Sequence, residues 1–180
     1  MKKPLLLFGF LIGILVTDIH SQTYLYAMGA RAGTDAGLTF KHFFKHFNSF
    51  EAILHYGRDD FFGLNKNMPG NNYSRLTALV QTHKHTKGLS HAPGLHYYLG
   101  VGGHLGFYNN AYVPTEDQSG KEEVNYIAFG LDINFGFEYM FLKEPFTVGI
   151  DLKPYYSWLT NPRAPKNNFN AALVFRHTIH

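Results

Sequence analysis

The sequence contains no cysteine, and only 16 % of its 180 residues are charged, against about 25 % in ordinary soluble domains. A chain without cysteine cannot form disulfides or be acylated as a lipoprotein, so burial, closure of a sheet or a membrane has to stabilise it. The net charge of +3 is small and is spread along the chain. Neither a nucleic-acid partner nor a basic membrane-binding stripe is therefore expected.

Long apolar runs are also missing, with one exception at the N-terminus. There, Met1-Lys2-Lys3 precedes an apolar run from Pro4 to Val16, and the small residue Ser21 follows shortly after. This order predicts a secretory signal peptide over residues 1–21, with a retained N-terminal anchor as the alternative. Residues 22–180 then form one domain, and no later run approaches the 18 apolar residues or so that a membrane helix requires.

Strand-like alternation dominates the rest of the chain, in which aromatic residues make up 17 % of the sequence. The stretch GLHYYLGVGGHLGFYN (94–109) places His96, Tyr98 and the glycines on one parity and apolar residues on the other. A period of two indicates a strand. Eight such segments are predicted, over Tyr24–Gly33, Gly37–Phe44, Phe50–Arg58, Ser74–Lys84, His96–Tyr108, Asn125–Phe141, Phe146–Ser157 and Phe169–His180.

Each predicted strand has one apolar face, rich in aromatic rings, and one face of charged, small polar and glycine residues. In the first segment this pattern assigns Tyr24, Tyr26 and Met28 to the apolar face. The second face carries seven charged residues, Arg31, Lys41, Glu51, Glu138, Asp151, Lys153 and Arg176. A soluble barrel or sandwich would turn the apolar face inward, whereas a membrane barrel would turn it toward lipid.

The connections and the glycines favour the membrane barrel. Three links at one predicted end are long, over 59–73, 109–124 and 158–168, while two at the other end are tight. Outer-membrane barrels have short periplasmic turns and longer outer loops. Glycines on the charged face leave room for long side chains in the narrow bore of an eight-stranded barrel. We therefore predict an all-β, eight-stranded antiparallel transmembrane barrel plugged by a structural ion-pair network, with Arg31 and Glu138 as one pair.

Several phrases resemble a known family, namely GARAGTDAGLTFKHFF, LHYYLGVGGHLGFYN, GFEYMF and EPFTVGIDLKPYYSW. Over the whole mature chain they are similar to the small bacterial outer-membrane barrels of the OmpA/OmpX-like class, in particular an uncharacterised outer-membrane β-barrel domain family. The resemblance implies a Gram-negative outer-membrane location and no established activity. Members commonly end in an aromatic residue, whereas this chain ends in His180.

No cofactor or metal site is expected. Histidines cluster as His42 with His46 and as His83 with His85, but no cysteine or pair of carboxylates completes a metal site beside either cluster.

We expect no enzyme either. Lipid modification would need a serine, a histidine and a carboxylate that converge, and no serine stands in a recognisable nucleophile motif. The five serines considered are Ser49, Ser74, Ser90, Ser119 and Ser157.

The expected function is that of a structural or surface-interaction protein in the outer membrane. Its expected partners are outer-membrane lipid, the barrel-assembly machinery and an extracellular ligand held by the loops at 59–73 and 109–124, because loops on a rigid barrel commonly carry binding. A monomer is expected. Two alternatives stay open, a secreted soluble lipocalin-like barrel that binds an apolar ligand and an outer-membrane lipid-modifying enzyme.

Overall fold

In the computed structural model, the described residues are 24–45, 47–58, 72–85, 94–115, 120–164 and 167–179. The predicted signal peptide, residues 1–21, lies outside these ranges. Within them, no helix is long and apolar enough to cross a membrane. The described elements are eight strands: β1 (Tyr26–Gly33), β2 (Ala36–Lys45), β3 (Asn48–Arg58), β4 (Asn72–His85), β5 (Leu95–Pro114), β6 (Lys121–Met140), β7 (Phe146–Leu159) and β8 (Asn167–Ile179).

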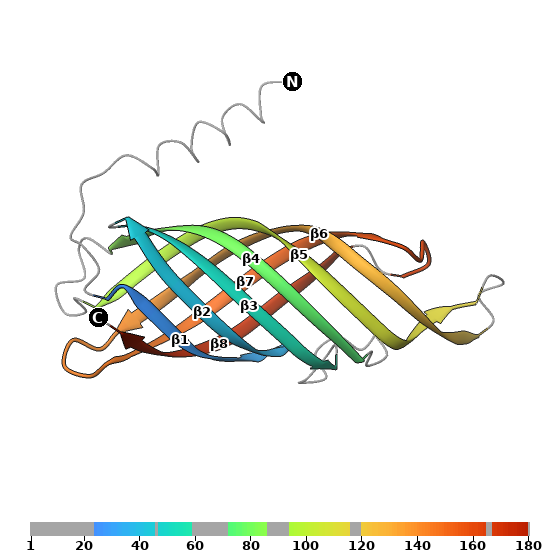
Figure 1. Cartoon of the computed structure of the whole chain (residues 1–180), viewed down its shortest axis with the longest axis horizontal. Helices are drawn as coiled ribbons and strands as arrows, with labels where there is room; N and C mark the ends of the chain where they lie inside the picture. Colours follow the sequence, from blue (N-terminus) through green and yellow to red (C-terminus); the bar gives the residue numbers. More distant parts are fainter. Residues whose placement is uncertain are drawn as a thin grey trace, which may run out of the picture.

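The strands form one closed antiparallel barrel in which each pairs with its neighbours in sequence and β1 pairs with β8. Figure 1 shows the strands tilted along the long axis, with the C-terminus at one end and the β5–β6 hairpin projecting at the other. We call these the near end and the far end. The prediction of an eight-stranded antiparallel barrel is confirmed, and closure leaves no unpaired sheet edge.

Burial follows the predicted parity in almost every strand. Along β6, Leu131 and Ile133 are exposed by 61 % and 52 %, whereas the alternating Asp132 and Asn134 are buried. The apolar face is therefore outside and the polar face lines the bore. Tyr24 is an exception to the prediction: it precedes β1 and turns inward, where its hydroxyl donates to Glu138 Oε1 at 2.5 Å.

The predicted loop over 109–124 is wrong in most of its length, because β5 and β6 continue to Pro114 and from Lys121 as a projecting hairpin. Alternation in the sequence breaks at Asn110, which has a φ of 51° and sits in a β-bulge. One extra residue in β5 shifts the inward parity from Tyr108 to Ala111. The bulge therefore hid the continuing strand from a simple period of two.

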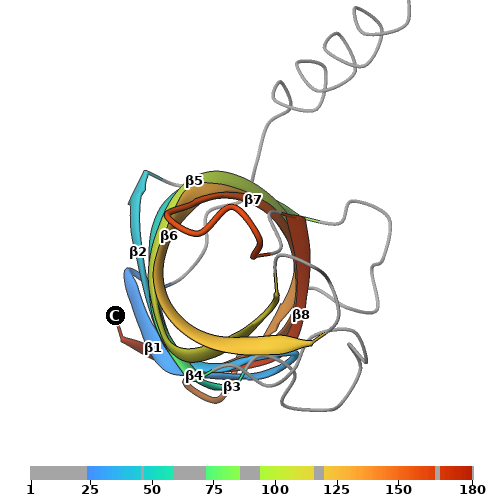
Figure 2. The ribbon, with the colours of Figure 1, turned by 90° about the vertical axis from the view of Figure 1, so that its right-hand side faces the viewer.

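Apolar residues close the bore at both ends. At the near end they are Tyr24, Ala27, Phe43 and Met140. At the far end an aromatic plug is formed by Tyr73, Tyr108, Ala111, Val113, Tyr126, Ala128 and Ala164. Figure 2, viewed from the far end, shows the segment after β7 folding inward over one side of the ring. The polar side chains of the bore are thus enclosed between two apolar layers.

Candidate functional site in the barrel lumen

The middle of the bore is filled with charged side chains in equal numbers of each sign. Among the described residues, the buried cations of the bore are Arg31, Lys41, Arg75, Lys153 and Arg176. The buried carboxylates are Asp35, Glu51, Asp132, Glu138 and Asp151. A buried charge costs several kcal/mol unless it is paired and hydrogen-bonded, so this balance is a condition for closing the barrel around them.

One network lies toward the near end and centres on Arg176. Its guanidinium donates to Glu138 Oε2 at 2.6 Å through Nη1 and to Glu51 Oε1 through Nη2. Lys41 Nζ adds a second cation 3.3 Å from Glu138 Oε2, and Gln81 Nε2 donates to Glu51 Oε2 at 2.6 Å. The two carboxylates are therefore held by charge-assisted hydrogen bonds from three strands and cannot move independently.

A second network lies toward the far end, around Asp35 in the turn between β1 and β2. Asp35 Oδ2 accepts from Arg75 Nη2 at 2.6 Å and lies 2.6 Å from His55 Nδ1, while Arg31 Nε lies 3.8 Å from Oδ1. Burial alone would raise the pKa of the Asp35 carboxyl, but the contact with His55 and the charges of Arg75 and Arg31 hold that pKa well below its ordinary value. Asp35 therefore counts as an anion in the charge balance at neutral pH.

All seven charged residues predicted for the bore lie in it and are buried. The predicted pair of Arg31 with Glu138 is wrong: Arg31 Nη1 instead donates to Asp151 Oδ2 at 3.3 Å. This difference follows from register, because Arg31 pairs with Val174 and Gly37, toward the far end, while Glu138 is near the opposite end of β6. Parity predicts the face of a residue but not its height along the bore.

Three buried charged residues of the bore were not among the seven predicted from the sequence, namely Asp35, Arg75 and Asp132. Arg75 and Asp132 share the inward parity of their strands, which was the available signal. Asp35 carried no such signal, because a turn residue has no strand parity.

A serine, a histidine and a carboxylate do converge, contrary to the expectation that no serine has such a setting. Ser157 Oγ lies 2.9 Å from His104 Nε2, and His104 Nδ1 lies 2.7 Å from Asp132 Oδ2. All three residues are buried, on β7, β5 and β6. The register brings them together, because His104 and Ser157 both pair with Gly130, one from each side.

Gly130 makes this meeting possible because it has no side chain between the two neighbours. A Cβ at position 130 would lie 2.7 Å from His104 Cε1 and 2.0 Å from the carbonyl oxygen of Tyr156, well inside ordinary van der Waals contact. The imidazole of His104 crosses this space to reach Ser157. The convergence therefore depends on a glycine in a particular register, and not on a sequence motif.

The described histidines of the two predicted clusters lie on opposite faces of the sheet, with His42 outside and His83 inside. His83 lies in the bore, 2.9 Å through Nε2 from Ser49 Oγ. His42 stacks on Tyr26 with ring centroids 4.7 Å apart, and His85 lies 4.6 Å from the ring of His96. His46 lies outside the described residues. In the part of the chain that the structure describes, no three histidine or acidic side chains converge as metal ligands.

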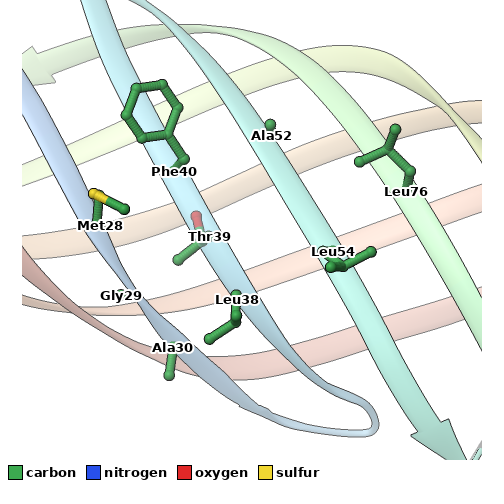
Figure 3. Close-up of a pocket in the computed structure, with 9 residues that line it drawn as sticks. All are labelled: Met28, Gly29, Ala30, Leu38, Thr39, Phe40, Ala52, Leu54 and Leu76. Carbon is green, nitrogen blue, oxygen red and sulfur yellow. The ribbon is translucent and has the colours of Figure 1, made fainter.

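A hollow of about 560 Å³ lies on the outer face, over β1 to β4. Figure 3 shows large apolar side chains, among them Met28, Phe40 and Leu54, around the smaller Ala30 and Ala52. Apart from Thr39, which is buried, the side chains that line it belong to the apolar face of the barrel. The hollow is therefore a feature of the outer surface, separate from the polar bore.

Comparison with known proteins adds no assignment. No protein-family model and no curated protein matches the sequence.

Proposed function

We propose that the chain is an integral outer-membrane β-barrel with a plugged lumen, exported by its predicted signal peptide, that acts as a structural or surface-interaction protein. The exposed face of the barrel carries the argument. Leucines are prominent on it, with Leu38 and Leu173 each exposed by 63 %. An apolar band around a whole barrel is stable against hydrocarbon and unstable in water.

The soluble lipocalin-like alternative requires the opposite polarity. A barrel of that kind keeps a ligand cavity inside and a polar surface outside. Here Lys41, Glu51, Lys153 and Arg176 occupy the bore, and apolar side chains make up the outer face. The burial pattern therefore favours a membrane barrel over a soluble carrier of apolar ligands.

Aromatic rings on the outer face lie near both ends, where a membrane barrel meets its two interfaces. Trp158 stacks on Phe129 with centroids 5.8 Å apart, toward the far end. Phe146 stacks on Phe175 with centroids 5.2 Å apart, toward the near end. Girdles of this kind are typical of outer-membrane barrels.

Conduction is not part of the proposal, because eight strands enclose a bore that side chains fill. The β5–β6 hairpin, which extends beyond its neighbours (Figure 1), is the proposed surface-interaction element. Its projecting part falls in the stretch 109–124, for which an extracellular ligand is expected. The other stretch, 59–73, lies mostly outside the described residues. We propose a monomer that contacts outer-membrane lipid and the barrel-assembly machinery.

Gel migration and extraction test the proposal. The mature chain should be recovered from membranes only with detergent. When left unheated, it should migrate on a denaturing gel at a different position from the boiled sample, because a closed barrel resists the detergent until it is heated. Recovery in buffer alone, with no shift on heating, would contradict the proposal.

A further inference from the structure

The two ring nitrogens of His104 contact the groups that a general base requires, a carboxylate at Nδ1 and a hydroxyl at Nε2. An ionised carboxylate only accepts hydrogen bonds, so Nδ1 of His104 carries the proton in its 2.7 Å contact with Asp132. In the neutral ring Nε2 then has a free lone pair, and it faces Ser157 Oγ at 2.9 Å. Lys153 Nζ lies 3.8 Å from the other oxygen of the same carboxylate, Asp132 Oδ1.

Two other hydroxyl–imidazole contacts in the bore lack this arrangement. Ser49 Oγ donates its one proton to Gln81 Oε1 at 3.2 Å, so it does not offer that proton to His83. Thr77 Oγ1 lies 3.2 Å from His55 Nε2, but Lys153 Nζ contacts the same nitrogen at 3.1 Å. An ammonium donates only, so the lone pair of His55 is already engaged. Among these contacts, only that of Ser157 combines a primary hydroxyl, an available base and an orienting carboxylate.

We propose that Ser157, His104 and Asp132 are the nucleophile, general base and orienting carboxylate of an esterase site that hydrolyses small carboxylic esters entering from the far end. This inference goes beyond the proposed structural role and departs from the sequence-based expectation of no catalysis. It rests on the order of the contacts from hydroxyl to imidazole to carboxylate, which is the order that activates a serine.

The surroundings of Ser157 favour an apolar acyl or aryl ester. One step further along β6 and β7, Ala128 pairs with Leu159, and Ala128 belongs to the aromatic plug. The site therefore lies toward the far end, next to the apolar and aromatic side chains of the plug.

Arg75 supplies positive charge next to Tyr155, whose ring contacts His104. Its guanidinium lies 4.7 Å from the ring centroid of Tyr155, and that ring lies 5.2 Å from the ring of His104. Nε and Nη1 of Arg75 are buried and make no hydrogen bond within the described ranges. Tyr155 therefore contacts both the Arg75 guanidinium and the His104 ring, and positive charge on this side of the site favours the negative oxygen that forms when an ester carbonyl is attacked.

The reaction balances with water as the only co-reactant. Ser157 Oγ bonds to the ester carbonyl carbon while its proton passes to His104 Nε2. The C–O bond then breaks, and the alcohol leaves with that proton. Water attacks the acyl-serine, again giving a proton to His104, and the carboxylic acid is released as Ser157 regains its hydrogen. Asp132 remains ionised throughout.

The segment 160–164 is expected to limit access to the site. It follows β7 and folds inward over one side of the ring (Figure 2), and Ala164 packs in the aromatic plug. Arg163 ties it to β6 through a hydrogen bond from Nη2 to Glu122 Oε1. Loosening this tie with Arg163→Ala should leave the Ser–His–Asp contacts intact and admit larger esters.

The test uses the full barrel folded in detergent micelles, with a fluorophosphonate as covalent probe and p-nitrophenyl acetate and butyrate as esters. The wild type should gain one phosphonyl adduct on Ser157, located by mass spectrometry, and should hydrolyse the esters. Ser157→Ala should lose the adduct and on the order of 10³-fold or more in hydrolysis, with similar losses for His104→Ala and Asp132→Asn. Ser49→Ala, which removes the matched hydroxyl beside His83, should label like the wild type.

Heat-dependent gel migration of each variant separates loss of activity from loss of folding, and it also reports on the proposed barrel independently of the labelling. The esterase proposal is overturned if neither the folded wild type nor folded Arg163→Ala is labelled. It is also overturned if folded Ser157→Ala reacts as fast as the wild type. Asp132→Asn adds a readout that simple packing does not explain, because it should slow labelling while Ser157 itself is still present.

Discussion

Replacing Arg176 by methionine is expected to lower the free energy of unfolding by about 3–5 kcal/mol, the range for a buried ion pair that loses one partner. The substitution leaves Glu51 and Glu138 buried without the cation that contacts both. Lys41 still lies beside Glu138, so most of the lost stability comes from Glu51, which loses its contact with a cation. Urea unfolding in phospholipid bilayers, followed by tryptophan fluorescence, measures the effect.

Two further variants show whether buried charge causes the loss. Arg163→Ala removes the partly exposed ion pair with Glu122 and should cost no more than about 1 kcal/mol, because water screens such pairs. Adding Glu51→Gln to Arg176→Met should recover part of the loss, because it removes one stranded charge. Equal costs for Arg176→Met and Arg163→Ala would show that water reaches the network around Arg176 and contradict a dry ion-pair cluster toward the near end.

Gly102→Ala is expected to destabilise the barrel by about 3 kcal/mol and to reduce the yield of folded protein, since backbone cannot move aside for a new methyl group as a side chain can. A Cβ at Gly102 would lie 1.9 Å from the carbonyl oxygen of Ala78 and 2.8 Å from the Cα of Leu79. Both contacts are with the neighbouring strand β4. The added methyl group would therefore push two paired strands apart.

Gly106 provides the matched control on the same face of β5. The three atoms nearest to a Cβ there all belong to side chains, with Tyr108 Cε2 at 3.1 Å and Arg75 Cγ at 3.5 Å. These atoms can shift by a few tenths of an ångström, so Gly106→Ala should cost about 1 kcal/mol or less. Both variants are compared by urea unfolding and by the fraction that shows heat-dependent migration. Equal losses would mean that close approach of the strands is not the reason for the glycine at 102.

The fold was predictable from sequence because apolar and polar residues alternate along each strand, and this alternation indicates which residues face outward. In β6, Leu131, Ile133 and Phe135 alternate with polar residues without interruption, and both the strand and its orientation follow from that pattern. The prediction failed where the period changes, as at the bulge containing Asn110. A single inserted residue made a continuous strand look like a loop.

The candidate esterase site was not predictable, because it depends on register across three strands. Ser157 stands at the predicted end of a strand, and His104 lies among glycines far away in the sequence. Nothing local indicates that both will pair with Gly130. The same limit explains the wrong partner for Arg31, since alternation specifies the inside of a barrel but leaves the order of layers along the bore unspecified.

Fluorescence quenching from two sides tests the inverted polarity of the barrel most directly. The chain has no cysteine, so a bimane label can be placed at a single site by Leu131→Cys or Ile133→Cys, with Glu123→Cys on the projecting hairpin as the control. In bilayers we expect brominated lipid, and not aqueous iodide, to quench the labels at 131 and 133, and the reverse at 123. Quenching of positions 131 and 133 by iodide but not by brominated lipid would contradict the account.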